Sequence, residues 1–176
     1  SQEKRTPVLT RFDDLVITRW GARFQGVTMP CAIGRGGIGV KGGEGDGITP
    51  RGTFQIMGCG YRPDRIGFDA PNVHCQPIAL TDVWSDDPRD PDYNHSADLR
   101  THRFSHERLR RADPLYDIFV ILDYNFPNAV AGKGSAIFLH KWRKPRHPTE
   151  GCVAFREDDL VRILTNWTPK SRVVIR

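Results

Sequence analysis

Apolar runs of strand length recur along the chain and predict a mainly β protein. Residues 7–34 are strand-like, and residues 53–57 alternate between polar and apolar positions. Residues 116–124 form the clearest core strand, and residues 135–142 and 172–176 carry two more apolar runs. No apolar run of the sequence reaches the length of a membrane-spanning helix.

Two short segments have a helical pattern. Apolar residues between positions 160 and 167 recur at helical spacing and predict an amphipathic helix packed on the sheet. Residues 105–111 predict a second short helix, with Ser105 as its N-cap and a strongly basic face. We expect one domain over residues 1–176, in which residues 1–6 are disordered or a remnant of a tag or of processing.

One apolar run ends in a histidine, and a cysteine begins another apolar run after a basic loop. Residues 135–140 end in His140, and Thr149, Glu150 and Gly151 lead into Cys152. A cysteine attacks as its thiolate, so it needs a proton acceptor and a positive environment to ionise near neutral pH. We therefore expect two neighbouring strands with a reactive pair at their ends, in which His140 is the base and the loop supplies positive charge.

The residues of this pair also have structural explanations. A cysteine on a strand is often a buried small hydrophobic residue, and a histidine at a strand end is often a polar cap. His147 is the alternative base because it is closer in sequence to Cys152, but a strand end fixes the orientation of His140 better. Gly151 leaves room for a substrate carbonyl, so we expect the N–H groups near Gly151 and Cys152 to stabilise an oxyanion.

The residues around this pair resemble the signature of the L,D-transpeptidase catalytic domain. That signature has a histidine, a variable spacer, and then Ser or Thr, His, Gly and Cys, followed by an apolar residue and by Asn or Arg. Here the matching residues are His140, Thr149, Gly151, Cys152 and Val153. The resemblance implies that Cys152 is the nucleophile and His140 the base, and that Thr149 supports His140 or the backbone turn.

Two further segments resemble the same family. Residues 44–54 are similar to its Gly-Asp-x-x-Thr-Pro-x-Gly-x-Phe segment, and residues 84–94 are similar to a segment of one bacterial subgroup. The matches extend roughly from residue 35 to residue 167. The resemblance implies a β-sandwich or barrel-like sheet with the cysteine in a cleft.

The sequence departs from the family signature at three points. Glu150 stands where the common pattern has His, Ala154 stands where it has Asn or Arg, and the spacer is shorter than usual. A proton relay or oxyanion contact from the missing histidine is therefore not carried over to this chain. The substrate contact at Ala154 is also in question, and Arg156 is a candidate to replace it.

The resemblance implies acyl transfer from a peptidoglycan tetrapeptide stem, without a metal or organic cofactor. The thiolate attacks the carbonyl between the diamino acid and the terminal D-alanine, and the acyl group passes to an amine of another stem, of a D-amino acid or of an outer-envelope protein. A carbapenem would acylate the same cysteine. One alternative is hydrolysis of the thioester, as in an L,D-carboxypeptidase or amidase. The other is a non-catalytic peptidoglycan-binding module, which the departures from the signature at Glu150 and Ala154 suggest.

Aromatic, amide and basic residues are candidates for the substrate-binding wall of the cleft. The candidates are Arg62, Trp84, Tyr93, Asn94, Trp142, Arg143 and Arg146. The two loop residues Arg143 and Arg146 are suited to meet a stem carboxylate. Ordinary packing is the alternative explanation for the aromatic residues.

The charge of the chain is moderately positive. Lys and Arg total 26 against 21 Asp and Glu, a net charge of +5. This charge favours solubility, or attraction to an anionic polymer such as peptidoglycan. Nucleic acid is a weaker candidate because the sequence has no recognised nucleic-acid motif. We expect a monomer exported to the periplasm or cell envelope, although the chain begins at Ser1 without a signal sequence.

The four cysteines permit at most one disulfide if Cys152 is a free nucleophile. Cys59 and Cys75 are the preferred pair, and unpaired buried thiols are the alternative. A zinc site is disfavoured because no close Cys-x-x-Cys or His-x-x-x-His pair occurs. The aspartates of residues 82–98 lack the order of an EF-hand, so we expect an ordered loop beside the cleft.

Overall fold

In the computed structural model, which describes residues 9–135 and 137–176, the chain forms two large sheets, two small sheets and one α-helix. The predicted mainly β class is thus confirmed. Residues 1–6, expected to be disordered or a remnant, lie outside the described residues. Among the described residues, no helix combines the length and apolar character needed to cross a bilayer.

The five-stranded sheet has the order β3-β2-β1-β16-β7. Its strands are β1 (Leu15–Thr18), β2 (Gly21–Phe24), β3 (Val27–Met29), β7 (Gly52–Phe54) and β16 (Val173–Ile175). The six-stranded sheet has the order β4-β15-β14-β13-β8-β9. Its strands are β4 (Cys31–Ala32), β8 (Ile56–Tyr61), β9 (Cys75–Pro77), β13 (Ile118–Leu122), β14 (Phe138–Lys141) and β15 (Val153–Phe155).

The smaller elements lie outside these two sheets. A three-stranded sheet with the order β11-β10-β12 consists of β10 (Asp82–Ser85), β11 (Ser96–Asp98) and β12 (His106–Arg108). A parallel pair consists of β5 (Ile38–Gly39) and β6 (Thr49–Pro50), and the helix is α1 (Glu157–Asn166).

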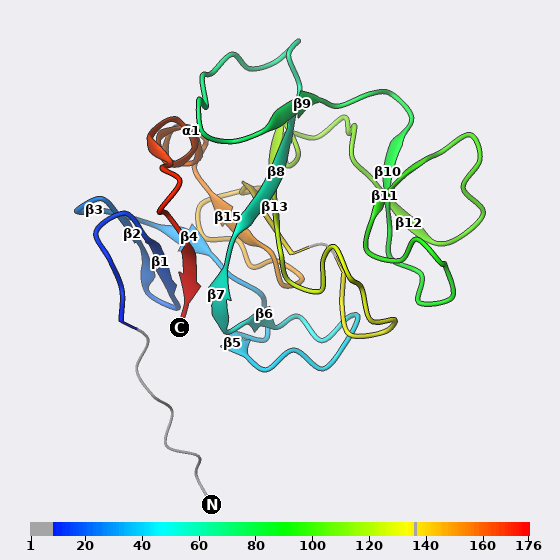
Figure 1. The fold of residues 1–176 in the computed structure, drawn as a ribbon, viewed down its shortest axis with the longest axis horizontal. Coiled ribbons are helices and arrows are strands. Elements are labelled where there is room, and N and C mark those ends of the chain that lie inside the picture. Colours follow the sequence, from blue (N-terminus) through cyan, green and yellow to red (C-terminus); the bar gives the residue numbers. More distant parts are fainter. Residues whose placement is uncertain (1–8, 136) are drawn as a thin grey trace, which may run out of the picture.

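The six-stranded sheet is the central layer of the molecule. Along β13, Ile118, Val120 and Leu122 face one way, into a core shared with the five-stranded sheet and α1. Phe119 and Ile121 face the other way, into a smaller apolar cluster that includes Trp84 of the three-stranded sheet. Figure 1 shows β1–β3 on one side of β8, β13 and β15, and β10–β12 on the other. The period-2 alternation of the central strands therefore builds two interfaces from one sheet.

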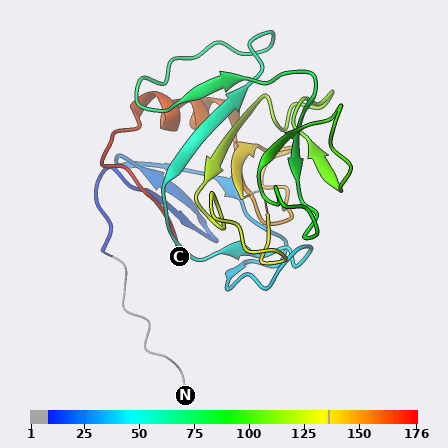
Figure 2. The ribbon, with the colours of Figure 1, turned by 45° about the vertical axis from the view of Figure 1, so that its right-hand side comes forward.

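The helix predicted near the C-terminus is confirmed. Leu160, Ile163 and Leu164 of α1 are fully buried in the main core. Trp167, directly after the helix, stacks on Phe24 with ring centroids 5.8 Å apart. Three acidic residues in the first turn favour the positive end of the helix dipole. Figure 2 shows the helix, in red-brown, beside the blue strands of the N-terminal region.

The second predicted helix, over residues 105–111, is wrong. Residues 106–108 form β12, which pairs antiparallel with β10 in a register that aligns Arg108 with Val83 and His106 with Ser85. A helix of two turns is marginal in isolation because nucleation is costly. The open edge of β10 instead supplies backbone partners that only the folded chain brings together.

Two other segments differ in detail from the sequence expectations. Residues 53–57 are divided between β7 and β8, which belong to different sheets, and the chain crosses from one to the other at Gln55. Cys59 and Cys75, the preferred disulfide pair, are aligned in the parallel β8–β9 ladder, and both are free thiols in the structure. The loop expected over residues 82–98 is only partly present, because its two ends form β10 and β11 and only residues 86–95 connect them as a loop.

Gly60 sets the packing between β8 and β13. A Cβ atom at Gly60 would lie 2.3 Å from the Phe119 ring, which belongs to the smaller cluster. We expect Gly60→Ala to lower the free energy of unfolding by about 1–3 kcal/mol, because a fixed ring must move. Urea denaturation measures this loss. Gly67→Ala is the control, since nothing lies within 4 Å of its Cβ position, and an equal loss in both variants would contradict the packing explanation.

Candidate active site

The pairing of β14 with β15 brings His140 and Cys152 to the same face of the central sheet. The two strands are parallel, and Leu139 lies opposite Val153 while His140 lies opposite Ala154. Leu139 and Val153 point into the main core. His140 and Cys152 therefore point the other way, toward the three-stranded sheet, since alternate residues of a strand face opposite sides. The predicted adjacency of the two strands is confirmed.

His140 and Cys152 line one cavity of about 570 Å³. The cavity lies between the central sheet and the three-stranded sheet. Its wall is formed by the catalytic loop over residues 142–152, by β12 and by the glycine-rich segment near Lys41. This volume is in the range of small-molecule and peptide sites.

The environment of His140 fixes its tautomer. Its side chain is buried, and Nδ1 lies 2.7 Å from the carbonyl oxygen of Lys141. A carbonyl only accepts, so Nδ1 carries the proton and Nε2 keeps its lone pair. Burial lowers the pKa of His140 to about 4. The imidazole is therefore neutral at physiological pH and competent to accept a proton.

The environment of Cys152 favours the thiol over the thiolate. Burial raises its pKa to about 12, and the charge of Glu107 acts in the same direction. The backbone N–H of Phe138 donates to Sγ at 3.4 Å and, with the Lys41 ammonium, partly offsets this effect. The basic loop was expected to lower the pKa of this thiol, but among the described residues the only nearby positive charge that does so is Lys41 of the glycine-rich segment. Burial thus favours a neutral thiol beside a neutral imidazole.

Thr149 closes the turn that presents Cys152. Its hydroxyl donates to the carbonyl oxygen of Cys152 at 2.5 Å and accepts from the N–H of Gly151 at 3.0 Å. Thr149 therefore contacts the backbone turn, one of the two roles expected for it. The Gly151 N–H that we expected to face an oxyanion is already engaged in this turn.

The segment that resembles the family's Thr-Pro motif holds the same turn from the other side. Thr49 is fully buried, and its hydroxyl donates to the carbonyl oxygen of Gly151 and accepts from the N–H of Gly34, both at 2.8 Å. The Cβ position of Gly34 would lie 3.1 Å from the Cα atom of Gly151. The glycine-rich segment thus packs backbone against backbone on the cysteine turn, which only residues without a side chain allow.

Lys41 is a site residue that the sequence did not reveal. Its side chain is 3% exposed, and Nζ donates to Asp46 Oδ1 at 2.7 Å and to the carbonyl oxygen of Ile48 at 3.2 Å. Nζ also lies 3.2 Å from the Cβ position of Gly151, and the alkyl stem passes 2.6 Å from that of Gly134. Two glycines with positive φ thus make room for one buried ammonium group beside the cysteine turn.

Besides the exposed Glu150, three carboxylate residues line the cavity: Glu44, Asp86 and Glu107. Tyr116 donates from its hydroxyl to Glu107 Oε1 at 2.6 Å, and its ring lies against His140. Tyr93 donates in the same way to Glu44 Oε1 at 2.6 Å. Oδ1 of Asp86 is buried and has no hydrogen-bond partner among the described residues. Glu107 was not recognised as a candidate because residues 105–111 were predicted to be a helix. Only the strand β12 directs its side chain into the cavity.

The predicted wall residues divide into two groups. Trp142 and Arg143 line the cavity, as do the turn residues Thr149 and Gly151, and His147 lies at its exposed side. The other predicted wall residues do not line it: they are Arg62, Trp84, Tyr93, Asn94 and Arg146.

The second group has structural contacts instead. Trp84 packs on Phe138 and donates from Nε1 to Asn94 Oδ1 at 3.0 Å. Arg62 forms an ion pair with Asp64 at 2.7 Å. Arg146 lines a separate hollow on the outer face of the five-stranded sheet. Aromatic and basic residues of the core and of a cleft wall have the same sequence pattern, so sequence alone does not separate them.

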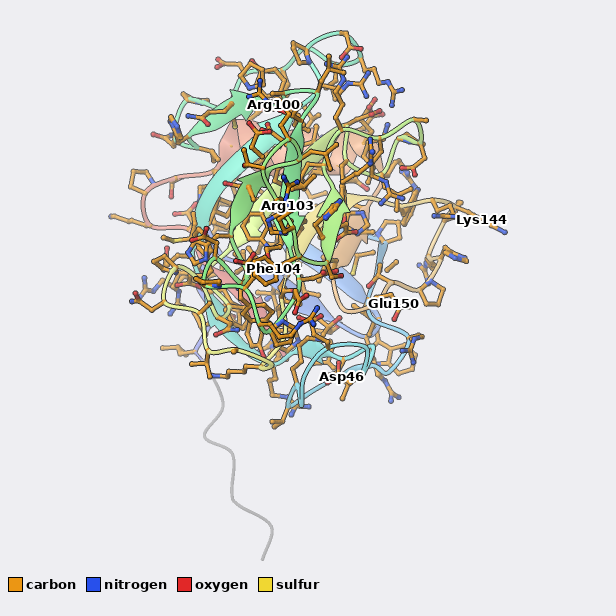
Figure 3. All side chains as sticks on the ribbon, turned by 90° about the vertical axis from the view of Figure 1, so that its right-hand side faces the viewer. Asp46, Arg100, Arg103, Phe104, Lys144 and Glu150 are labelled. Carbon is orange, nitrogen blue, oxygen red and sulfur yellow. The ribbon has the colours of Figure 1, made fainter. Side chains whose placement is uncertain are left out.

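Of the two positions that depart from the family signature, Glu150 lies at the edge of the site and Ala154 lies inside it. Glu150 is exposed and forms an ion pair with Arg35 at 3.1 Å. Figure 3 shows Glu150 and Lys144 on the loop at the same edge of the molecule, with Asp46 below them. Ala154 lines the cavity, and the guanidinium group of Arg156 lies 6.0 Å from the ring of Trp142. Among the described residues, no group of three or more His, Cys, Asp or Glu side chains is placed to hold a metal ion.

The buried neutral imidazole of His140 links stability to pH. Its pKa is 6.5 when unperturbed and about 4 in the fold, so the unfolded chain binds more protons between these values. We expect the free energy of unfolding to fall by about 3 kcal/mol between pH 7 and pH 4. In His140→Gln, urea denaturation across this range should show a smaller loss. Carboxylates with lowered pKa, such as Asp46, act mainly below pH 4. Identical losses in both proteins would contradict the assignment.

Comparison with known proteins agrees with this geometry. A search of curated proteins gave no match, and neither did a search of solved structures. The family model of the YkuD L,D-transpeptidase catalytic domain matches residues 17–175, a range that contains His140, Cys152 and the supporting glycine-rich segment. The chain belongs to the YkuD family of L,D-transpeptidase catalytic domains.

Proposed function

We propose that the chain is a peptidoglycan L,D-transpeptidase that transfers an acyl group through Cys152. The observation that carries the proposal is that Cys152 and His140 lie on the same face of the central sheet and line the same cavity. In addition, the carbonyl oxygen of Lys141 fixes Nδ1 of His140. This arrangement leaves Nε2 as the acceptor of the thiol proton. A nucleophile, a base and a group that orients the base are the components that cysteine acyl transfer requires.

The first half-reaction forms a thioester. His140 Nε2 takes the proton of Cys152 as sulfur attacks the carbonyl carbon between the diamino acid and the terminal D-alanine of a tetrapeptide stem. The carbon–sulfur bond forms, and the carbon–nitrogen bond then breaks. The departing D-alanine amine receives the proton from the imidazolium. Because both groups start neutral, proton transfer accompanies the attack.

The second half-reaction transfers the acyl group to an amine. The amine attacks the thioester, His140 takes its proton, and the carbon–sulfur bond breaks to return the thiol. The acceptor is the side-chain amine of another stem, a D-amino acid, or an amine of an envelope protein. We place the reaction in the periplasm or cell envelope, because the donor polymer lies there, and we expect a monomer.

The charges of the cavity suit a substrate that carries both amine and carboxylate groups. Glu44, Asp86 and Glu107 line the cavity together with Arg111 and Arg143, and Arg111 lies 3.7 Å from Glu107. The buried Oδ1 of Asp86 has an open acceptor position for an ammonium donor. A stem that contains a diamino acid has groups of both kinds.

Lys41 stabilises the oxyanion of the tetrahedral intermediate in this proposal. Its ammonium has three donors, of which Asp46 and Ile48 receive two. The remaining donor lies beside the Gly151–Cys152 turn, where the family signature has a histidine at position 150 and this chain has an exposed glutamate. A fixed charge in a site shielded from water stabilises developing negative charge more than it would in solution.

Product analysis tests the transfer reaction. We expect wild type, incubated with a disaccharide-tetrapeptide and a D-amino acid, to release D-alanine and yield the exchanged stem, with a thioester visible by intact mass. Cys152→Ala should be inactive, and His140→Gln slower by about 10²–10⁴-fold. A free-acid product alone would assign hydrolysis. No reaction by wild type would leave the binding-module alternative, which retention of the fragment on immobilised protein would then support.

Acylation by a carbapenem isolates the role of Lys41. We expect Lys41→Met in an Asp46→Asn background to acylate Cys152 about 10²-fold more slowly than Asp46→Asn alone, since loss of one oxyanion donor costs about that much. Intact mass against time measures the rate. Asp46→Asn is the matched control, because it keeps the ammonium while removing the ion pair. Equal rates in the two variants would contradict a role for Lys41 in the reaction.

A further inference from the structure

A second hollow, of about 460 Å³, lies on the outer face of the five-stranded sheet, away from the active cavity. Val16 contributes to its apolar floor, and it pairs with Arg23 on the face of the sheet that points away from the main core. Three arginines surround that floor and come from three parts of the chain: Arg23 from β2, Arg176 from the end of the chain after β16, and Arg146 from the catalytic loop.

Among the described residues, none of the three guanidinium groups forms an ion pair with an acidic side chain. No Asp or Glu is among the described residues that line the hollow. Eight other arginines do form ion pairs among the described residues, as Arg172 does with Asp14 at 2.7 Å. Three unpaired guanidinium groups around one hollow form a site complementary to an anion, and arginine binds carboxylates in a bidentate geometry.

Arg146, which lines this hollow, has an unusual backbone conformation. Residues 144–147 form a turn that is closed by a hydrogen bond from the His147 N–H to the Lys144 carbonyl at 3.0 Å. Arg146 occupies the third position with a φ of +59°, where Gly or Asn is the usual residue. Strained residues of this kind cluster at binding and active sites, which makes Arg146 a candidate for a role in binding.

Trp20 extends the hollow with an exposed aromatic surface. Its side chain is 75% exposed, and the guanidinium group of Arg19 covers one face of the ring at 4.2 Å from the centroid. An indole that is both exposed and held in place is suited to an amphipathic ligand. The hollow therefore combines positive charge with apolar surface.

We propose that this hollow, defined by Trp20, Arg23, Arg146 and Arg176, binds the stem-peptide carboxylates of an intact peptidoglycan strand. This inference rests on the proposed function and adds a second contact with the polymer. The catalytic loop connects the two sites, because Trp142 and Arg143 line the active cavity while Arg146 lines the hollow. A strand that occupies both would be retained at the enzyme between turnovers, since linked contacts raise the effective concentration.

Binding to isolated cell-wall sacculi tests the proposal with Arg23→Glu/Arg176→Glu. We expect this double variant to bind sacculi at least 10-fold more weakly than wild type, and to turn over the soluble disaccharide-tetrapeptide within twofold of wild type. The control is Arg103→Glu/Arg162→Glu, which changes the net charge equally at exposed positions outside both sites; Figure 3 labels Arg103 on the side of the three-stranded sheet. Equal loss of binding in the control would overturn the proposal.

Chemical modification of the sacculi identifies the anion. Amidation of the stem carboxylates should remove the difference between wild type and Arg23→Glu/Arg176→Glu. If amidation leaves that difference while removal of phosphate-bearing wall polymers abolishes it, the ligand is a phosphate polymer and the proposal is overturned. Sacculus binding is measured without turnover, so an inactive wild type would count against the proposed reaction and not against this site.

Arg146→Gly separates binding from folding. Glycine relieves the positive φ, so we expect the midpoint of thermal unfolding to stay the same or rise while binding to sacculi falls several-fold. Unchanged binding would remove Arg146 from the site. A fall in the unfolding midpoint would show that the side chain serves the fold instead.

Discussion

The parallel pairing of β14 with β15 is the constraint on which the site depends. It fixes which residues of the two strands share a face, because a shift of one residue would turn His140 and Cys152 into the main core and expose Leu139 and Val153. The cost of exposing those two buried aliphatic side chains, about 1.5–3 kcal/mol each, holds the register. The arrangement of His140 and Cys152 is thus stabilised by the same apolar contacts that stabilise the fold.

Burial then decides the protonation state of the site. The side of the central sheet that carries His140 is covered by the three-stranded sheet, and the resulting loss of solvation lowers the pKa of His140 and raises that of Cys152. Both shifts favour neutral groups. A covered site of this kind disfavours the thiolate, so attack by the thiol requires a base beside the nucleophile.

The local pattern of apolar and polar residues was sufficient to predict some strands and the C-terminal helix. The strands that carry His140 and Cys152, the C-terminal helix and the mainly β class follow from apolar periodicity, because their burial is visible in the sequence. The family signature added the pairing of the two reactive residues. Thr49 could be recognised only as part of a motif, and its hydrogen bond to the Gly151 carbonyl required the fold.

Other parts depend on contacts between distant segments. The strand β12 exists because the edge of β10 is available, and this pairing outweighs the helical pattern of residues 105–111. Lys41 reaches the site because Gly134 and Gly151 leave space for it, and neither lies near it in sequence. Trp84 and Tyr93 were expected on the cavity wall, and they instead pack behind it and hold other groups in place.

The most direct measurement of the central claim is the pH dependence of the first-order rate of Cys152 acylation by a saturating carbapenem. With neutral groups whose pKa values lie at about 4 for His140 and about 12 for Cys152, we expect the rate constant to be flat from about pH 5 to about pH 9. A tenfold rise through pH 6–7 would show an imidazole with an ordinary pKa. A rise that continues toward pH 9 and persists in His140→Gln would show a free thiolate acting without a base, and either result would contradict the neutral pair.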